Sequence, residues 1–270
     1  MAAAVALHLE LEVEETGAFS VDTGGLDVSA GRDNLVVRAF ETQHPADGIA
    51  FTLRSEIPLA RGLGSSAAAI VAGLTAADHL FELAVSPEDL LARATELEGH
   101  PDNVAAALYG GFVICETSKG GVPRAARFDP PEGLEGLIVI PAEEISTKRA
   151  REAIPAEVPV ADAVANVAAA SLLVLGLQRG DLDLVGRGLR DSLHQPRRRA
   201  LYERSMELVE DAAGFGALGA TVSGAGPAVL VWTTWQDAGR VAGALEARCA
   251  GWAEVRRLPF SPHGADVPEL

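Results

Sequence analysis

The sequence is poor in cysteine, in positive charge and in long apolar runs, and each shortage excludes a class of protein. Two cysteines among 270 residues, Cys115 and Cys249, are too few for the disulfide framework of a small secreted domain. The first residues lack a basic segment and become acidic at once, which does not fit a signal peptide. The longest apolar run, residues 164–177, contains polar interruptions and is shorter than the roughly 20 residues that a membrane span needs.

Basic side chains are outnumbered, with 22 Lys and Arg against 38 Asp and Glu and a net charge of −16. Such a chain repels phosphate backbones and anionic lipid, so we expect no nucleic-acid partner and no membrane partner. An anionic ligand would depend on local positive potential and on a metal ion. Hydrophobic residues still make up 48% of the chain, enough for a core. We therefore expect a soluble, cytoplasmic protein.

Periodicity and turn residues predict an α+β protein with two lobes, because helices and strands mix without regular alternation. Ser86 and Pro87 are typical of a helix start. The Pro-Pro-Glu-Gly stretch at 130–133 predicts a boundary between domains 1–132 and 133–270. The expected strands are residues 5–13, 49–54, 112–115, 124–128, 137–140, 218–222 and 228–232 and one near Val255; the expected helices are 33–42, 67–83, 86–98, a run ending near Gly214, and 236–247.

A glycine-rich stretch, residues 58–68, is the most distinctive local pattern. Gly62 and Gly64 allow positive φ and a close approach of the backbone to a ligand. The Ala-rich helix expected next would point its unsatisfied N–H groups and positive dipole end at the loop. With Ser65 and Ser66 these features predict an anion cradle; the alternative is a tight strand-to-helix turn capped by two serines. No lysine follows the second glycine, so the pattern is not a P-loop.

A second cluster, Glu98-Gly99-His100-Pro101-Asp102-Asn103, follows the end of an expected helix. A carboxylate is electrostatically unfavourable at the C-terminus of a helix, and a divalent cation nearby would remove the conflict. Mg²⁺ is typically held by one or two carboxylate or hydroxyl groups together with nucleotide phosphates. The alternative is a polar loop ending in an asparagine turn.

Small residues and basic residues form the remaining candidate motifs. Ser223-Gly224-Ala225-Gly226-Pro227 lies between two expected strands, where the backbone can approach a ligand or simply form a hairpin turn. Basic residues gather at 146–151 and 195–199. Arginine binds carboxylates through a planar fork of donors, whereas a solvated charge run is the alternative.

The order of these motifs resembles the GHMP kinases, a superfamily that includes galactokinase, homoserine kinase, mevalonate kinase and phosphomevalonate kinase. The resemblance covers nearly the whole chain. Within the superfamily, residues 100–105 (HPDNVA), 146–151 (STKRAR) and 194–198 (HQPRR) are similar to the homoserine kinase family. The resemblance implies an α+β, two-lobed GHMP kinase fold, with a ribosomal protein S5 domain 2-like N-terminal lobe and a ferredoxin-like α+β C-terminal lobe.

The same resemblance implies ATP and Mg²⁺ as cofactors and L-homoserine as the substrate, phosphorylated on its side-chain hydroxyl in threonine biosynthesis. Ser66 and Glu98 would hold Mg²⁺, Asn103 would orient the hydroxyl, and Asp102 is the only candidate base in its motif. Arg151, Arg198 and His100 would bind the substrate with Asn103. The implied ATP-binding residues are Pro58, Leu59, Ala60, Arg61, Gly62, Leu63, Gly64, Ser65, Ser66, Ala67, Ala68, Asn34, Ser223, Gly224 and Gly226.

Three points stay open from the sequence. Asn34 fits a helix cap as well as a contact near adenine. Gln195 stands where the family usually has an acid before the proline, which leaves the support of Arg198 in doubt. The rivals to a homoserine kinase are another GHMP kinase, acting on mevalonate-like or sugar substrates, and a catalytically impaired relative that binds nucleotide. A homodimer is also implied.

The family's members begin with a Pro-x-Ser-x-x-Asn-Leu-Gly-x-Gly-Phe-Asp motif, and this sequence contains no similar stretch. Residues 3–14 resemble the strand that follows that motif. From this we expect a substrate pocket open on one side and a poorly soluble or nearly inactive product. A start codon assigned too far downstream is the expected cause.

Overall fold

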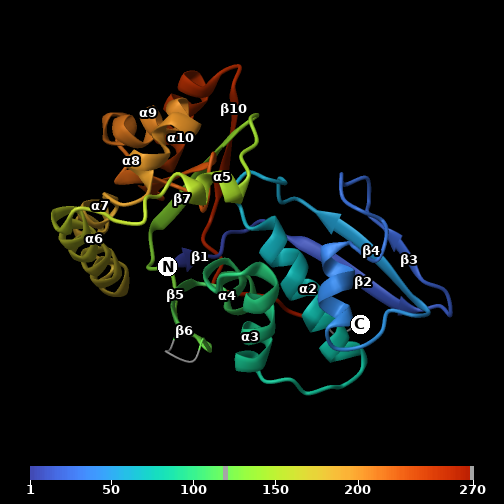
Figure 1. Cartoon of the computed structure of the whole chain (residues 1–270). Helices are drawn as coiled ribbons and strands as arrows, with labels where there is room; N and C mark the ends of the chain where they lie inside the picture. Colours follow the sequence, from blue (N-terminus) through green and yellow to red (C-terminus); the bar gives the residue numbers. More distant parts are fainter. Residues whose placement is uncertain (118–120, 268–270) are drawn as a thin grey trace. The chain divides into compact units, whose positions relative to one another are not determined.

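The computed structural model describes residues 1–117 and 121–267, which form two compact units (Figure 1). The first unit comprises Met1–Pro58, Gly64–Asp129 and Ser261–Leu270, and the second comprises Leu59–Leu63 and Pro130–Phe260. The mixture of helices and strands in each unit confirms the expected α+β fold. The domain limits expected from the sequence, 1–132 and 133–270, stay a proposal.

Within the described residues, the first unit contains two small sheets and four helices. One sheet has the order β1-β5-β6 and is antiparallel; the other has the order β2-β4-β3, with β3 parallel to β4. Its strands are β1 (Ala2–Ala3), β2 (Leu9–Glu15), β3 (Ser20–Asp22), β4 (Ile49–Ser55), β5 (Phe112–Thr117) and β6 (Pro123–Phe128), and its helices are α1 (Leu35–Glu41), α2 (Ser65–Leu80), α3 (Pro87–Glu98) and α4 (Asp102–Tyr109).

Helix α3 begins and ends where local chemistry predicts. The Ser86 side chain accepts a hydrogen bond from the Asp89 backbone N–H, Pro87 occupies the first turn, and Gly99 ends the helix at φ 84°. Helix α4 was not expected, because the sequence after Glu98 was interpreted as a loop. Pro101 precedes it and Asp102 lies in its first turn, both of which favour a helix start.

Strand β2 starts four residues later than its alternating pattern predicts. Leu9 is the first residue paired with β4, opposite Ser55, which is the last residue of that strand. Upstream of it, the Leu7 backbone N–H bonds to the Val5 carbonyl at 2.7 Å, in a turn. The alternation of apolar and polar residues begins at Val5, upstream of the first residue that has a partner in β4. A prediction from alternation alone therefore placed the start of the strand too early.

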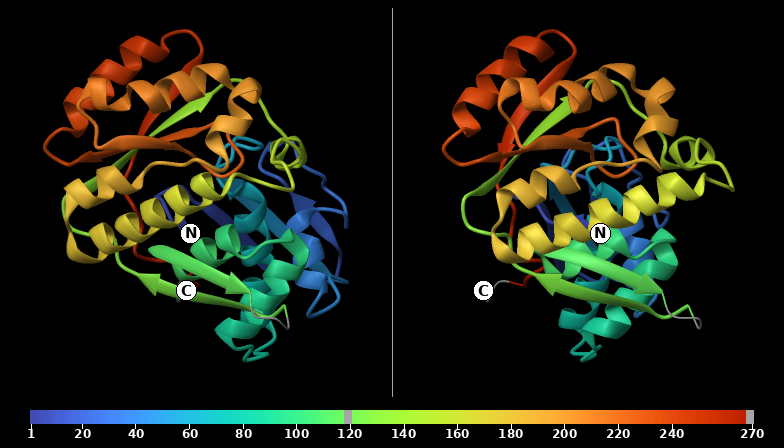
Figure 2. Two further views of the ribbon diagram at one scale, coloured as in Figure 1. Left: turned by 60° about the vertical axis from the view of Figure 1, so that its left-hand side comes forward. Right: turned by 90° about the vertical axis from the view of Figure 1, so that its left-hand side faces the viewer.

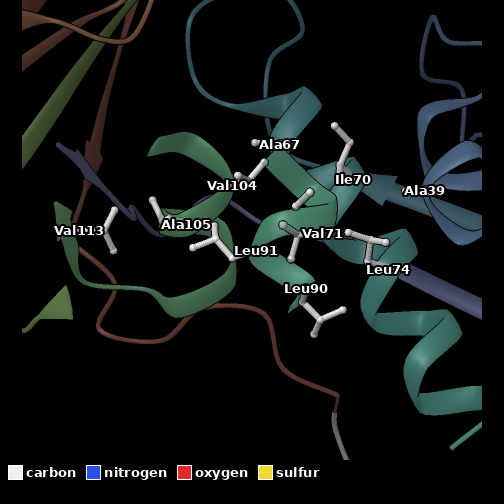
Figure 3. Packing of buried hydrophobic residues seen from close by; sticks show 12 residues of the cluster. Ala39, Ala67, Ile70, Val71, Leu74, Leu90, Leu91, Val104, Ala105 and Val113 are labelled. Atoms are coloured by element: carbon white, nitrogen blue, oxygen red, sulfur yellow. The ribbon is translucent and has the colours of Figure 1, made fainter. Parts of the chain in front are cut away.

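The first unit has one buried hydrophobic cluster among α2, α3, α4 and β5 and another among α1, α2 and β4. In the first cluster, Figure 3 shows side chains of the three helices pointing toward one another, with Val113 of β5 beside α4. Gly73 of α2 allows α1 to approach closely, because a Cβ there would lie 2.2 Å from the Val36 carbonyl oxygen. This packing fixes the start of α2 and the end of α3, which carry two of the predicted site residues.

The second unit is built on one antiparallel sheet of order β10-β7-β9-β8. Helices α9 and α10 cover one face of it (Figure 2). Their buried side chains pack on those of β7 and β9. Its elements are β7 (Leu134–Pro141), α5 (Thr147–Glu152), α6 (Val160–Arg179), α7 (Leu182–Gly188), α8 (Gln195–Arg198), η1 (Arg199–Leu201), α9 (Glu203–Asp211), η2 (Ala212–Phe215), β8 (Gly219–Val222), β9 (Val229–Thr234), α10 (Ala238–Cys249) and β10 (Ala253–Leu258).

Helix α6 corrects one argument made from the sequence. It has 20 residues and is the one helix of the described chain that is long and apolar enough to cross a membrane by length and composition. The apolar run 164–177 underestimated its length, because the helix begins at Val160. A single helix of this kind is weak evidence for a membrane span.

Candidate active site

The glycine-rich stretch divides between the units, and its second half starts helix α2 in the first unit. Gly64 is the N-cap residue at φ 76°, a left-handed conformation that favours glycine. The first backbone N–H groups of any helix have no acceptor within it. In the described residues no side chain accepts from those of α2. These groups and the helix dipole suit an anion such as phosphate. Ser65, Ser66, Ala67 and Ala68 form this first turn.

Ser66 and Glu98 meet within the first unit. The Ser66 hydroxyl donates a hydrogen bond of 2.5 Å to Glu98 Oε2, which joins the start of α2 to the last residue of α3. The Glu98 carboxylate therefore faces the positive end of a second helix, which relieves part of its conflict with its own helix. Hydroxyl and carboxylate oxygens suit Mg²⁺, so the pair fits a metal ion that also binds phosphates. No group of three or more His, Cys, Asp and Glu in residues 1–117 and 121–267 is placed to hold a metal.

His100 lies between two carboxylates. Its Nδ1 is 2.6 Å from Asp102 Oδ1, and its Nε2 is 3.7 Å from Glu98 Oε1. Asp102 Oδ1 also accepts a hydrogen bond of 2.9 Å from the Asn103 backbone N–H. Burial acts to raise the pKa of the Asp102 carboxyl, but these hydrogen bonds outweigh it and leave the pKa below its ordinary value. A carboxylate with a lowered pKa accepts protons poorly, which weakens Asp102 as a candidate base.

Asn34 is the N-cap of α1. Its side chain is 4% exposed, and both ends of the amide are occupied. Oδ1 accepts a hydrogen bond of 2.9 Å from the Val36 N–H, and Nδ2 donates one of 2.6 Å to the Ser29 carbonyl. The capping role considered from the sequence is present, and a contact with adenine stays a prediction.

The first half of the stretch, Leu59–Leu63, belongs to the second unit and is anchored there by Arg61. The guanidinium donates to the carbonyls of Pro141 and Ala142, at 2.9 and 2.8 Å, and pairs with Glu144 at 2.9 Å. Ala60 adopts φ 54°, which is rare for a residue with a side chain. The contacts of Arg61 thus anchor the segment to the second unit. Its expected contact with ATP stays a prediction.

Gly62 and the Ser223–Gly226 turn interlock backbone to backbone. The Ser223 hydroxyl donates a hydrogen bond of 2.8 Å to the Gly62 carbonyl. A Cβ on Gly62 would lie 2.4 Å from the Ser223 carbonyl oxygen, and one on Gly224 would lie 3.0 Å from the Gly62 carbonyl oxygen. The turn is also the hairpin between β8 and β9, with the Ser223 N–H bonded to the Ala228 carbonyl at 2.8 Å. Within this unit, the backbone of the turn therefore closely approaches the glycine-rich segment rather than a ligand.

Three consecutive arginines, Arg197, Arg198 and Arg199, have different surroundings. Arg197 pairs with Asp162 at 2.8 Å and Arg199 pairs with Glu210, so both are neutralised by the unit's own acids. Arg198 has no acidic partner among the described residues. This difference favours Arg198 as the one that binds an anionic ligand.

Arg198 is held by backbone carbonyls. Its Nε donates to Ala150 of α5 at 2.9 Å and its Nη1 to Gly224 at 3.1 Å. Of the five guanidinium N–H donors, these two are occupied, which leaves the rest of the fork for a carboxylate. Gln195 does not support Arg198: its side chain is 7% exposed and accepts a hydrogen bond of 2.7 Å from the Val222 N–H.

Arg151 lies in the last turn of α5 and is exposed. The helix starts at the Ser146 side chain, which accepts a hydrogen bond of 3.3 Å from the Arg149 N–H. Arg151 forms no ion pair with any residue that the structure describes, so its guanidinium is available to a ligand.

Sequence reasoning missed Asp191, which holds the start of α8. Its carboxylate accepts hydrogen bonds from the backbone N–H groups of Leu193, His194 and Gln195, at 2.7, 3.1 and 3.0 Å. Burial acts to raise the pKa of the Asp191 carboxyl, but the hydrogen bonds from His194, Leu193 and Gln195 outweigh it and hold the pKa well below its usual range. An aspartate just before a proline-containing helix start is a capping signal that could have found it.

Two family models match the chain: the GHMP kinases N terminal domain over residues 34–111 and the GHMP kinases C terminal over residues 173–251. A homoserine kinase of Synechococcus sp. (strain CC9311) is 43% identical over 76% of this chain and 67% of that protein. One of Prochlorococcus marinus (strain MIT 9215) is 37% identical over 88% of this chain and 77% of that protein. The crystal structure of homoserine kinase from Cytophaga hutchinsonii ATCC 33406 has a TM-score of 0.83 at 28% identity, covering 96% of this chain and 89% of that one.

The matched models fall on the parts of the chain that carry the site. The N-terminal model includes the glycine-rich stretch, Glu98 and Asn103, and the C-terminal model includes Arg198 and the Ser223–Gly226 turn. The relatives extend the similarity over most of both chains. The chain therefore belongs to the GHMP kinase family, whose members use ATP.

Proposed function

We propose that the chain transfers the γ-phosphoryl group of ATP to the side-chain hydroxyl of L-homoserine, giving O-phospho-L-homoserine in threonine biosynthesis. The observation that carries the proposal is the 37–43% identity to homoserine kinases over most of the chain. The geometry supports it with an uncapped helix start in the first unit and an arginine without acidic partner in the second.

Phosphoryl transfer depends mainly on positioning and charge neutralisation, so the proposed roles need no strong nucleophile. The N–H groups at the start of α2 and the glycine backbone bind the ATP phosphates. Ser66 and Glu98 hold Mg²⁺, which neutralises phosphate charge when bound. Their 2.5 Å contact supports this assignment, because one ion can take both oxygens as ligands.

The acceptor is bound by its charges and oriented by an amide. Arg198 and Arg151 pair with the carboxylate, His100 contributes a ring nitrogen, and Asn103 orients the hydroxyl. The lowered pKa of Asp102, with its carboxylate already accepting two hydrogen bonds, supports a mechanism without a strong base.

The proposal also includes the cellular location and the oligomeric state of the enzyme. The predominance of acidic residues, with a net charge of −16, supports a soluble, cytoplasmic enzyme. A homodimer rests on the family resemblance, and sedimentation velocity measures it directly.

A coupled assay of ADP release tests the function. We expect slow but measurable Mg²⁺-dependent release with L-homoserine and none above background with mevalonate or galactose. Turnover with another acceptor alone would make the chain a GHMP kinase of different specificity. Calorimetric ATP binding without turnover on any acceptor would make it a nucleotide-binding relative.

A further inference from the structure

Tyr202 carries a buried hydroxyl without a hydrogen-bond partner among the described residues. Its side chain is 3% exposed, and it lies between η1 and α9, where its backbone N–H bonds to the Arg199 carbonyl at 3.2 Å. Buried phenol groups nearly always have a partner, because an unmet hydroxyl loses its hydration without compensation. An unmet phenol next to a residue that we propose binds the acceptor therefore points to a partner acquired in another state.

The ring of Tyr202 lies against the Ser223–Gly226 turn. A Cβ on Gly226 would be 2.7 Å from Tyr202 Cε1 and 3.0 Å from Cζ, the carbon that bears the hydroxyl. The ring also belongs to a buried apolar cluster with Ile145, Ala150 and Met206. The hydroxyl is thus the polar end of a side chain in an otherwise apolar cluster.

Arg198 and Asp191 are the charged groups that act on this hydroxyl. Burial and, more weakly, the charge of Asp191 raise the pKa of Tyr202, whereas the positive charge of Arg198 and its side-chain contact with the phenol act against that shift. The Arg198 guanidinium therefore lies close to the phenol oxygen, although the hydroxyl has no hydrogen bond of regular geometry among the described residues. The two carbonyls that hold Arg198 belong to the same surroundings: Ala150 is in the cluster of Tyr202, and Gly224 is in the turn that its ring contacts. One of the N–H donors that these two carbonyls leave free can therefore turn toward the phenol oxygen.

We propose that Tyr202 is a positioning residue for Arg198, whose guanidinium donates a hydrogen bond to the phenol oxygen when it binds the carboxylate of an amino-acid acceptor. The inference rests on the proposed function, because it assigns Arg198 to the acceptor. A third fixed acceptor sets the plane of the fork, and the N–H donors that remain can then meet the two carboxylate oxygens together.

The replacement Tyr202→Phe tests the proposal, since it keeps the ring against Gly226 and removes only the hydroxyl. We expect the KM for homoserine to rise about 10-fold or more, in line with a lost hydrogen bond to a charged group, with an unchanged KM for ATP. The free energy of unfolding should stay the same or increase. The matched control is Thr233→Val, which removes the other buried hydroxyl without a partner in this unit and should leave both KM values unchanged.

A double-mutant cycle with Arg198→Leu, which removes every donor at this position, shows whether Tyr202 acts through Arg198. In the Arg198→Leu background we expect Tyr202→Phe to have no further effect on the KM for homoserine. An unchanged KM in the single variant, or an equal rise in both backgrounds, overturns the inference while the function stands. Absence of homoserine turnover by the unmodified chain overturns the function and this inference with it.

Discussion

Ser66 and Glu98 place two oxygens in contact at the start of one helix and the end of another, and the replacement Glu98→Gln tests whether they serve a metal. The amide can still accept the Ser66 hydrogen bond, so the fold should be kept. We expect Mg²⁺-dependent kcat to fall by ~10²-fold or more, as when a group that stabilises transition-state charge is lost. Steady-state kinetics over a Mg²⁺ titration measures the change. An unaltered kcat at saturating Mg²⁺ would remove Glu98 from the metal site.

Arg198 differs from Arg197 and Arg199 in having no acidic partner among the described residues, and Arg151 also forms no ion pair there. The replacement of Arg151 or Arg198 by leucine should act on the acceptor. Each change should raise the KM for homoserine about 10- to 100-fold, with a much smaller effect on the KM for ATP. Arg199→Leu is the matched control, because Arg199 is already paired with Glu210. If the KM for ATP rises instead, both arginines serve the phosphates.

The sequence could indicate Arg198 only through the family resemblance. Arg198 lies between two other arginines, which differ from it because they pair with Asp162 and Glu210. These two acids are distant along the chain, so the sequence alone does not reveal the pairing. The role proposed for Tyr202 could not be predicted from the sequence, because it depends on the packing of the ring against Gly226 and on a hydroxyl without a hydrogen bond among the described residues. Glu98 was found because a carboxylate at a helix end is a local anomaly.

Among the elements, α8 depends on the charge of Asp191, which predicts a pH dependence of stability. The pKa of Asp191 is depressed in the folded chain, so its contribution is fully present above the unfolded value of about 3.9. It is lost as the pH falls below that value toward the folded pKa. We expect unmodified protein to exceed Asp191→Asn in unfolding free energy at pH 6, with a smaller difference at pH 3. Urea titrations at both values measure it, and an equal difference would contradict the prediction.

The elements that were predicted correctly are those with local signals. Ser86, Pro87 and Gly99 set the limits of α3 through capping and backbone freedom, which neighbouring residues alone decide. The start of β2 was wrong because it depends on where the partner strand ends. Helix α4 was missed because His100, Pro101 and Asn103 resemble a turn when packing against α2 is not considered.

At the scale of the whole molecule, the net charge of −16 opposes the approach of an anionic nucleotide. Salt screens this repulsion, so the KM for ATP should fall between 20 and about 200 mM KCl at saturating Mg²⁺. Homoserine is a zwitterion without net charge, and its KM should change less over the same range. A KM for ATP that rises with salt would show that local positive charge outweighs the charge of the chain.

The interlocked turns at Gly62 and Gly224 also determine how this protein can evolve. The atoms that a side chain would meet at either position are main-chain atoms, which no substitution elsewhere removes. A second mutation can compensate a first where two side chains meet, but not at Gly62 or Gly224, where the clash is with the backbone. In a saturation library selected for growth, we expect both positions to return only glycine, with no epistatic rescue. Gly25 is the internal comparison: its φ of 84° disfavours side chains, but a Cβ there meets nothing within 4 Å, so it should tolerate replacement better.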